Sequence, residues 1–183
     1  MTEDKRYSGV AMLLHWLIAV AVIVNWRLAE AAEEATVRAD AFAYMGNHKS
    51  LGITILVLTL LRIGWRLIHR PPPLRASMAG WEKALAKAVH VIFYVLLLGL
   101  PLGGWLAESY EGHAVNVWGL FSLPALPVGE NEALSHTLAE IHGTSGKIML
   151  LLIVLHVAGM LKHMVVDKDG NLWRMLPFGT PKA

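Results

Sequence analysis

Residues Ile141–His163, IHGTSGKIMLLLIVLHVAGMLKH, form an apolar segment that contains histidines. The segment has the length of a membrane-spanning helix, which needs about 20 mostly apolar residues. His142 and His156 lie inside it, and His163 lies at its end. Ionisable side chains inside a membrane are costly and by default indicate function. The segment therefore predicts a transmembrane helix that carries a functional site.

The spacing of His142 and His156 places both side chains close to one face of this helix. At about 100° per residue they are about 1400° apart, which leaves them about 40° from perfect alignment. At about 1.5 Å per residue they are separated by about 21 Å along the helix axis, so one imidazole lies near each side of the membrane. This arrangement suits two haem groups, one in each leaflet.

The rest of the chain is similarly apolar. Its 183 residues are 55% hydrophobic and have a mean hydropathy of +0.48, values that exceed those of an ordinary soluble domain. Four apolar segments, at about residues 10–28, 48–68, 88–106 and 141–163, explain this composition and predict an all-α fold, a four-helix transmembrane bundle. We expect a single domain over residues 1–183, with a polar connection over 29–47 and the longest loop over 108–140.

The first apolar segment has a competing interpretation as a secretory signal peptide. Lys5 and Arg6 precede it, and Ala29-Glu30-Ala31 resembles a cleavage site. His15 and Trp16 inside the apolar run fit a signal peptide poorly, so we interpret the segment as the first span.

Cysteine and charge exclude several classes of site. The chain has no cysteine, which excludes disulfides, iron–sulfur clusters and covalently attached haem. The pI near 9.0 reflects charge in the loops rather than a basic domain for nucleic acid. With four spans both termini share a side, and that side carries twelve of the 16 Lys and Arg residues. The other side carries Arg27, Arg38, Lys49 and Lys147. Because positive residues concentrate on the cytoplasmic side, we expect cytoplasmic termini and a multi-pass protein of the bacterial inner membrane.

This topology assigns a depth to each membrane histidine. His15 and His156 fall in the cytoplasmic half of the bilayer, and His48 and His142 fall in the outer half. Ligation of b-type haem by two histidines needs neutral imidazoles on both sides of the porphyrin, and helical bundles build such sites from facing helices. We expect His15 with His156, and His48 with His142, to bind the irons of two non-covalent haem b groups.

Two other interpretations of the four histidines are weaker. The first interprets them as satisfied polar residues in helix contacts, but four that match in depth are unlike isolated cases of this kind. Metal transport would need three or four ligands at one point, often with carboxylate or thiolate groups. The apolar cores of the spans contain no acidic residue and the chain has no cysteine.

Glycines and basic residues extend the outer site. Gly52 and Gly146 each lie one turn from an outer histidine and leave room for a porphyrin, although close helix packing also uses glycine. Lys49 and Lys147 flank the outer histidines and are candidate partners of haem propionates or of the substrate. On the cytoplasmic side, Arg62 is the corresponding candidate partner of a propionate.

Two further histidines belong to the cytoplasmic side. His90 opens the third segment and is an alternative ligand of the inner haem, or a hydrogen-bond partner of a propionate or a quinone. His163 lies about two turns beyond His156, where it suits proton handling beside a quinone. The competing interpretation of His163 is a histidine whose polar end reaches the membrane surface.

Several motifs occur together along the chain. They are Leu14-His15-Trp16 in the first segment, His48-x-x-x-Gly52 leading to Arg62 and Trp65-Arg66 in the second, His90 with Tyr94 and Leu100-Pro101 in the third, and His142 with His156 in the fourth. In this combination they resemble the bacterial cytochrome b561 family over nearly the whole chain. The resemblance implies four transmembrane helices that hold two haem b groups, with His15, His48, His142 and His156 as ligands. It also implies electron traffic between the periplasmic side and the quinone pool.

Two functions are compatible with these observations. The first is an oxidoreductase of the superoxide:quinone type, an activity of the family in which superoxide is oxidised outside and ubiquinone is reduced. The second is a non-enzymatic cytochrome b subunit that passes electrons for a partner dehydrogenase or hydrogenase. The outer side carries nine Asp and Glu residues against four Lys and Arg, although a site that collects an anion benefits from positive potential. Both functions imply the lipid bilayer and a quinone as partners, and the second function adds a redox partner protein.

Overall fold

The computed structural model describes residues 6–179, which form four long helices and a small hairpin. The helices are α1 (Gly9–Glu34), α2 (Arg38–Ile68), α3 (Gly80–Tyr110) and α4 (Glu132–Lys162). A π-helix, η1 (His163–Asp167), continues α4, and a 3-10 helix, η2 (Asn171–Met175), follows it. All four long helices are long and apolar enough to cross a membrane. The predicted four-helix transmembrane bundle is confirmed.

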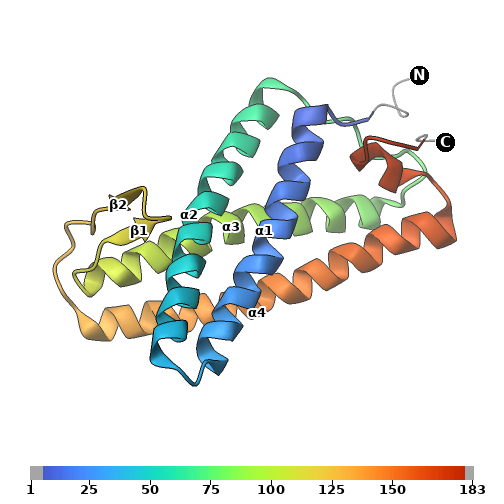
Figure 1. Ribbon diagram of the computed structural model, residues 1–183. Coiled ribbons are helices and arrows are strands. Elements are labelled where there is room, and N and C mark those ends of the chain that lie inside the picture. The colour runs from blue at the N-terminus through green and yellow to red at the C-terminus, as the bar shows by residue number, and fades with distance from the viewer. Residues whose placement is uncertain (1–5, 180–183) are drawn as a thin grey trace.

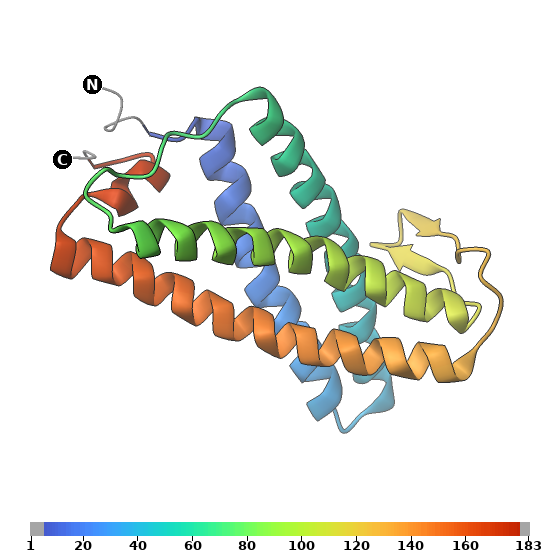
Figure 2. The same ribbon diagram turned by 180° about the vertical axis from the view of Figure 1, so that it is seen from behind.

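The helices are arranged as two antiparallel pairs. α1 packs along α2, and α3 packs along α4 (Figure 1). The view from behind shows the same two pairs, which cross each other steeply (Figure 2). Contacts between α2 and α3 help to join the pairs. The crossing brings residues of α1 and α2 onto the inward face of α4.

Large apolar side chains cover the outside of the bundle. Leu13, Val95 and Val154 are 59%, 63% and 64% exposed, and such exposure in water would favour aggregation. In a bilayer these side chains contact lipid instead, which removes the cost. The apolar residues buried within the described bundle are few, Leu14 and Met149 among them. The exposed apolar surface therefore supports a location in the membrane.

The polar connection expected over residues 29–47 is wrong in its extent. α1 continues to Glu34 and α2 begins at Arg38, so only residues 35–37 connect the two helices. Hydropathy marks the apolar part of a helix, whereas backbone hydrogen bonds continue into water where the sequence permits it. The predicted spans are therefore the apolar centres of longer helices.

A β-hairpin lies beside α2 in the long loop expected between the third and fourth helices. Its strands, β1 (Val115–Val117) and β2 (Phe121–Leu123), pair antiparallel. Val115 and Val117 are buried together with Ile53 of α2. We call the side of the molecule with this hairpin and the 35–37 connection the hairpin end.

A buried serine fastens the hairpin to α2. Ser50 Oγ lies 3.0 Å from the carbonyl oxygens of Gly46 and Asn116, and it accepts a hydrogen bond from the Trp118 N–H at 3.1 Å. Trp118 has a φ of 55°, a rare conformation for a bulky residue. Its indole N–H also donates to Thr54 Oγ1 at 3.0 Å. These hydrogen bonds fix the hairpin to α2 at Ser50, two residues after His48.

The two ends of the described chain meet on the opposite side, which we call the terminal end. The Tyr7 N–H donates to the Arg174 carbonyl oxygen at 3.1 Å, and the Trp16 indole N–H donates to the Met175 carbonyl oxygen at 2.8 Å. Arg174 in turn donates to the Pro73 carbonyl oxygen at 2.9 Å. The C-terminal segment therefore closes the bundle over α1 and over the connection between α2 and α3.

Candidate cofactor site

The membrane histidines meet as two pairs on α4. The ring centroids of His48 and His142 are 5.9 Å apart, with an interplanar angle of 73°. Those of His15 and His156 are 6.3 Å apart, with an interplanar angle of 70°. Each histidine pair connects α4 with a helix of the α1–α2 pair, through His48 on α2 and His15 on α1. The structure therefore brings together the same partners that the predicted depths suggested.

The separation within each pair fits a metal-centred group. Two imidazole nitrogens that bind one metal from opposite sides, each at about 2 Å, place their ring centroids about 6 Å apart. Both observed separations are close to this value. The large interplanar angles are compatible with it, because each ring plane can rotate about the axis that joins the two nitrogens. The residues present thus fit a haem iron between each pair.

Backbone carbonyls orient the two histidines nearer the hairpin end. His48 Nδ1 lies 2.9 Å from the Asn25 carbonyl oxygen of α1, and His142 Nδ1 lies 3.0 Å from the Leu100 carbonyl oxygen of α3. A carbonyl oxygen only accepts hydrogen bonds, so Nδ1 carries the proton in the neutral ring. Nε2 then keeps its lone pair, which is the arrangement of a histidine that ligates a metal.

Glycines surround the same pair. A Cβ atom added at Gly146 would meet no atom within 4 Å, and one at Gly52 would make only an ordinary contact, at 3.8 Å from Asn25 Nδ2. At Gly104 of α3, however, an added Cβ would lie 3.4 Å from His142 Cε1. Gly104 thus allows α3 to approach the His142 ring, a role that sequence reasoning missed. The space beside Gly146 is open to a flat group.

Three imidazoles converge near the terminal end. The ring centroid of His90 on α3 lies 5.7 Å from that of His156, with an interplanar angle of 68°. Phe93 contacts the same ring edge-on, with centroids 5.5 Å apart. His15 and His90 are therefore both within reach of an iron ligated by His156. His90, the alternative ligand predicted for the inner haem, therefore lies close enough to His156 for that role.

The three basic candidates differ in their surroundings. Arg62 donates to the Ala11 carbonyl oxygen at 2.6 Å, one turn from His15 on the side of the terminal end. Lys49 forms an ion pair with Glu108 at 2.7 Å, so its charge is already compensated. Lys147 is exposed, but five residues from His142 correspond to about 140° around the helix from that face. Of the three, Arg62 has the best position to reach a haem propionate.

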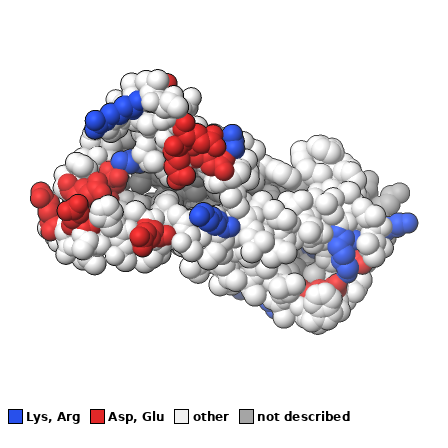
Figure 3. Space-filling view, turned by 90° about the horizontal axis from the view of Figure 1, so that it is seen from below, with Lys and Arg blue, Asp and Glu red and all other residues white. Residues whose placement is uncertain are grey.

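The hairpin end is predominantly acidic. On the left of the view from below, which is the side of the hairpin, acidic side chains form larger groups than basic ones (Figure 3). In addition to the Lys49 pair, Arg27 forms an ion pair with Glu30. The acidic residues predicted for this side are Glu30, Glu33, Glu34, Asp40, Glu108, Glu111, Glu130, Glu132 and Glu140. This charge does not attract anions over long distances.

His163 lies apart from both pairs, beyond the last turn of α4. Its Nδ1 is 2.9 Å from Asp167 Oδ2 and 2.8 Å from Asp169 Oδ2. Sequence reasoning identified His163 but missed both aspartates, although their nearness in the chain was a usable signal. His113 and His136 are exposed at the hairpin end and do not join either pair.

Comparison with known proteins places this geometry in a family context. Residues 6–178 match the family model described as Prokaryotic cytochrome b561. Cytochrome b561 homolog 2 of Escherichia coli K12 is 29% identical over 174 residues, 94% of this chain and 92% of that protein. The probable superoxide oxidase CybB of Yersinia pestis is 31% identical over 175 residues, 94% of this chain and 97% of that protein. Cytochrome b562 of Cereibacter sphaeroides is 30% identical over 181 residues, 96% and 98% of the two chains.

Proposed function

Because the chain belongs to the prokaryotic cytochrome b561 family, we propose that it is a membrane oxidoreductase that passes electrons from periplasmic superoxide to ubiquinone. Family membership makes it a multi-pass bacterial membrane protein of electron transport that carries haem b. The bacterial inner membrane and cytoplasmic termini are part of the proposal. They are supported by the excess of Lys and Arg on the side of the termini.

The two histidine pairs on α4 are the observation on which the proposal depends. We assign His48 and His142 to one haem b, and His15 and His156 to a second, since both pairs have the separation of a bis-histidine site. Bound haem supplies one-electron chemistry. α4 carries one histidine of each pair, so a single helix holds both sites in a fixed relation across the membrane.

The proposed reaction balances two one-electron steps against one two-electron step. Two superoxide anions lose one electron each near the hairpin end and become two molecules of oxygen. One ubiquinone near the terminal end gains these two electrons and two protons and becomes ubiquinol. In this scheme His163 delivers a proton to the quinone oxygen, and Arg62 neutralises negative charge beside His15.

The acidic hairpin end favours a second candidate function. The negative surface around Glu108 and Glu132 does not steer superoxide, but it is complementary to a positively charged protein surface. A cytochrome b subunit that accepts electrons from a docked dehydrogenase or hydrogenase would use such a surface. For superoxide, entry then depends on local positive charge, and because Lys49 is paired with Glu108, Lys147 is the nearer candidate source.

Turnover by the purified chain distinguishes the two functions. We expect the protein, purified alone in detergent and supplied with enzymatically generated superoxide and a soluble ubiquinone, to form one ubiquinol for every two superoxide anions consumed. Because the hairpin end is acidic, the rate should stay constant or rise as salt is added. A haem-loaded protein that turns over only when a co-purified dehydrogenase is present would contradict the enzymatic proposal and support the subunit.

A pair of variants tests the ligands nearer the terminal end. We expect His15→Ala to lose one haem per chain, and His90→Ala to retain both, because one iron has two axial positions and His15 belongs to the motif Leu14-His15-Trp16. Haem content is measured by the pyridine haemochrome method against protein concentration. Retention of both haems in His15→Ala, with loss of one in His90→Ala, would transfer the ligand role to α3.

A further inference from the structure

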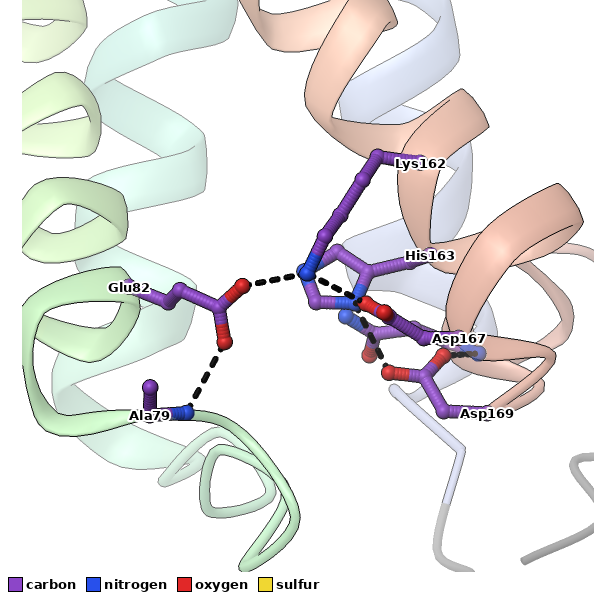
Figure 4. A network of polar contacts seen from close by, with 7 residues as sticks. Ala79, Glu82, Lys162, His163, Asp167 and Asp169 are labelled. Carbon is purple, nitrogen blue, oxygen red and sulfur yellow. Dashed lines mark hydrogen bonds and ion pairs between the residues drawn. The ribbon is translucent and has the colours of Figure 1, made fainter.

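A cluster of charged groups surrounds His163 at the terminal end. Figure 4 shows Asp167 and Asp169 approaching the His163 ring, while Lys162 bridges Asp167 and Glu82 of α3. His163 and Asp169 have only 14% and 8% of their side chains exposed, whereas Asp167 is 28% exposed. The cluster therefore connects a nearly buried imidazole to an acid that contacts solvent.

The backbone is folded so that both aspartates reach the same nitrogen. After α4 the chain widens into the π-helix η1, a form that is rare and frequent at functional sites. Lys168 then adopts a left-handed conformation, with a φ of 51°, and the chain turns back. The N–H groups of Lys168 and Asp169 both donate to the His163 carbonyl oxygen. This turn brings the Asp169 side chain back beside the His163 ring.

Further contacts hold the two carboxylates in place. Asp169 Oδ1 accepts a hydrogen bond from the Asn171 N–H at 2.9 Å, which leaves Oδ2 directed at His163. Asp167 Oδ2 lies 2.8 Å from Lys162 Nζ. Lys162 also contacts Glu82, whose other oxygen accepts from the Ala79 N–H at 2.8 Å. The end of α4 is thus fastened to the start of α3, and the position of His163 is restrained.

The surroundings of the His163 Nδ1 atom are acidic. Nδ1 is buried and lies within 2.9 Å of two carboxylate oxygens. Neither contact has the geometry of a linear hydrogen bond, so the main attraction is between charges. When the ring is protonated, its Nδ1–H lies beside these two carboxylates. A protonated ring carries a second N–H at Nε2, which is available as a proton donor.

We propose that Asp167 and Asp169 are positioning residues that hold the His163 ring by Nδ1, so that the Nε2–H of the protonated ring serves as the proton donor for quinone reduction. This inference rests on the proposed reduction of ubiquinone near the terminal end. As the quinone gains an electron, the Nε2–H bond breaks and an O–H bond forms on the quinone oxygen. The neutral ring keeps its Nδ1–H between the carboxylates and regains a proton at Nε2 from the cytoplasmic water.

The cluster is better suited to this role than to a metal ion. One nitrogen and two carboxylate oxygens, from His163, Asp167 and Asp169, lie close enough together to act as ligands. Lys162 Nζ, however, already lies against the Asp167 carboxylate and supplies a cation there. A divalent ion beside this ammonium group would be repelled. The Asp167 carboxylate therefore already has a cationic partner.

Replacement of Asp169 tests the proposal. Asp169→Asn keeps the side-chain shape and an oxygen for the Asn171 N–H, but it removes one negative charge from Nδ1. We expect oxidation of the haems by a soluble ubiquinone, followed by stopped-flow absorbance, to slow by about tenfold or more, because the ring loses one of the two carboxylates that hold it. Asp169→Glu restores the charge and should recover most of the rate. Haem content and the rate of haem reduction by superoxide should remain those of the unmodified protein.

Asp40→Asn is the matched control, since it makes the same change at an exposed position on α2, at the hairpin end. An unchanged quinone rate in Asp169→Asn would overturn the role of the carboxylates. A loss that Asp169→Glu does not recover would also overturn it and indicate a purely structural role. If the unmodified protein itself exchanges no electrons with the quinone, the proposed function fails first, and the inference fails with it.

Discussion

The His142→Ala variant is expected to bind one haem per chain where the unmodified protein binds two. His142 is paired with His48 at a ring separation of 5.9 Å, and its Nδ1 is oriented by the Leu100 carbonyl oxygen. Removal of the imidazole leaves an iron between the pair with one protein ligand and leaves that carbonyl without its donor. The pair formed by His15 and His156 does not depend on this side chain, so its haem should remain.

The measurement is the ratio of pyridine haemochrome to protein for the purified variant. His156→Ala should lose the other haem, and the two variants should differ in the position of the remaining absorption band. Added imidazole should partly restore haem in His142→Ala, because a free ligand fits the space left by the side chain. His136→Ala is the control, since His136 is exposed on the same helix. Two haems in His142→Ala would contradict the assignment of this pair.

The His163→Ala variant is expected to separate the two halves of the reaction. Reduction of the haems by superoxide should continue, because both histidine pairs are intact. Re-oxidation by ubiquinone should slow by about a hundredfold, which is the lower range for loss of a general acid or base. Since His163 follows His156 by about 10 Å along the helix axis, the variant removes a proton donor without removing a haem ligand.

Stopped-flow absorbance follows each half-reaction separately in the same preparation. His69→Ala provides the control, because His69 is an exposed histidine that follows α2 and stacks on Trp65. This control should leave both rates unchanged. A normal rate of quinone reduction in His163→Ala would exclude His163 as the proton donor. Loss of both rates together would instead indicate that the variant has disturbed the inner haem site.

Much of the candidate site was predictable from spacing and topology alone. Residues 14 apart on one apolar helix recur near the same face and at opposite depths. The positions of His15 and His48 in their own segments then predicted one partner for each by depth, with His90 as an alternative on the cytoplasmic side. The structure brings the same side chains together. These side chains lie together because a membrane restricts each polar side chain to a depth that sequence position defines.

The orientation of these side chains was not predictable in the same way. His48 and His142 depend on the carbonyl oxygens of Asn25 and Leu100, and a backbone carbonyl is present in every residue. The close approach at Gly104 depends on how α3 and α4 cross. The same limit applies to Asp169, which reaches His163 only because the chain widens and then turns back after α4.

The sequence by itself determined the four apolar helices, the side shared by the two termini and the end of the bundle near which each paired histidine lies, because hydropathy and helical periodicity act along the chain. Only the tertiary structure decided which backbone groups orient the imidazoles and how far each helix extends beyond its apolar centre. It also decided that Lys49 is paired with Glu108 rather than free. These features arise from contacts between segments far apart in sequence, and such contacts form only when the two pairs of helices cross.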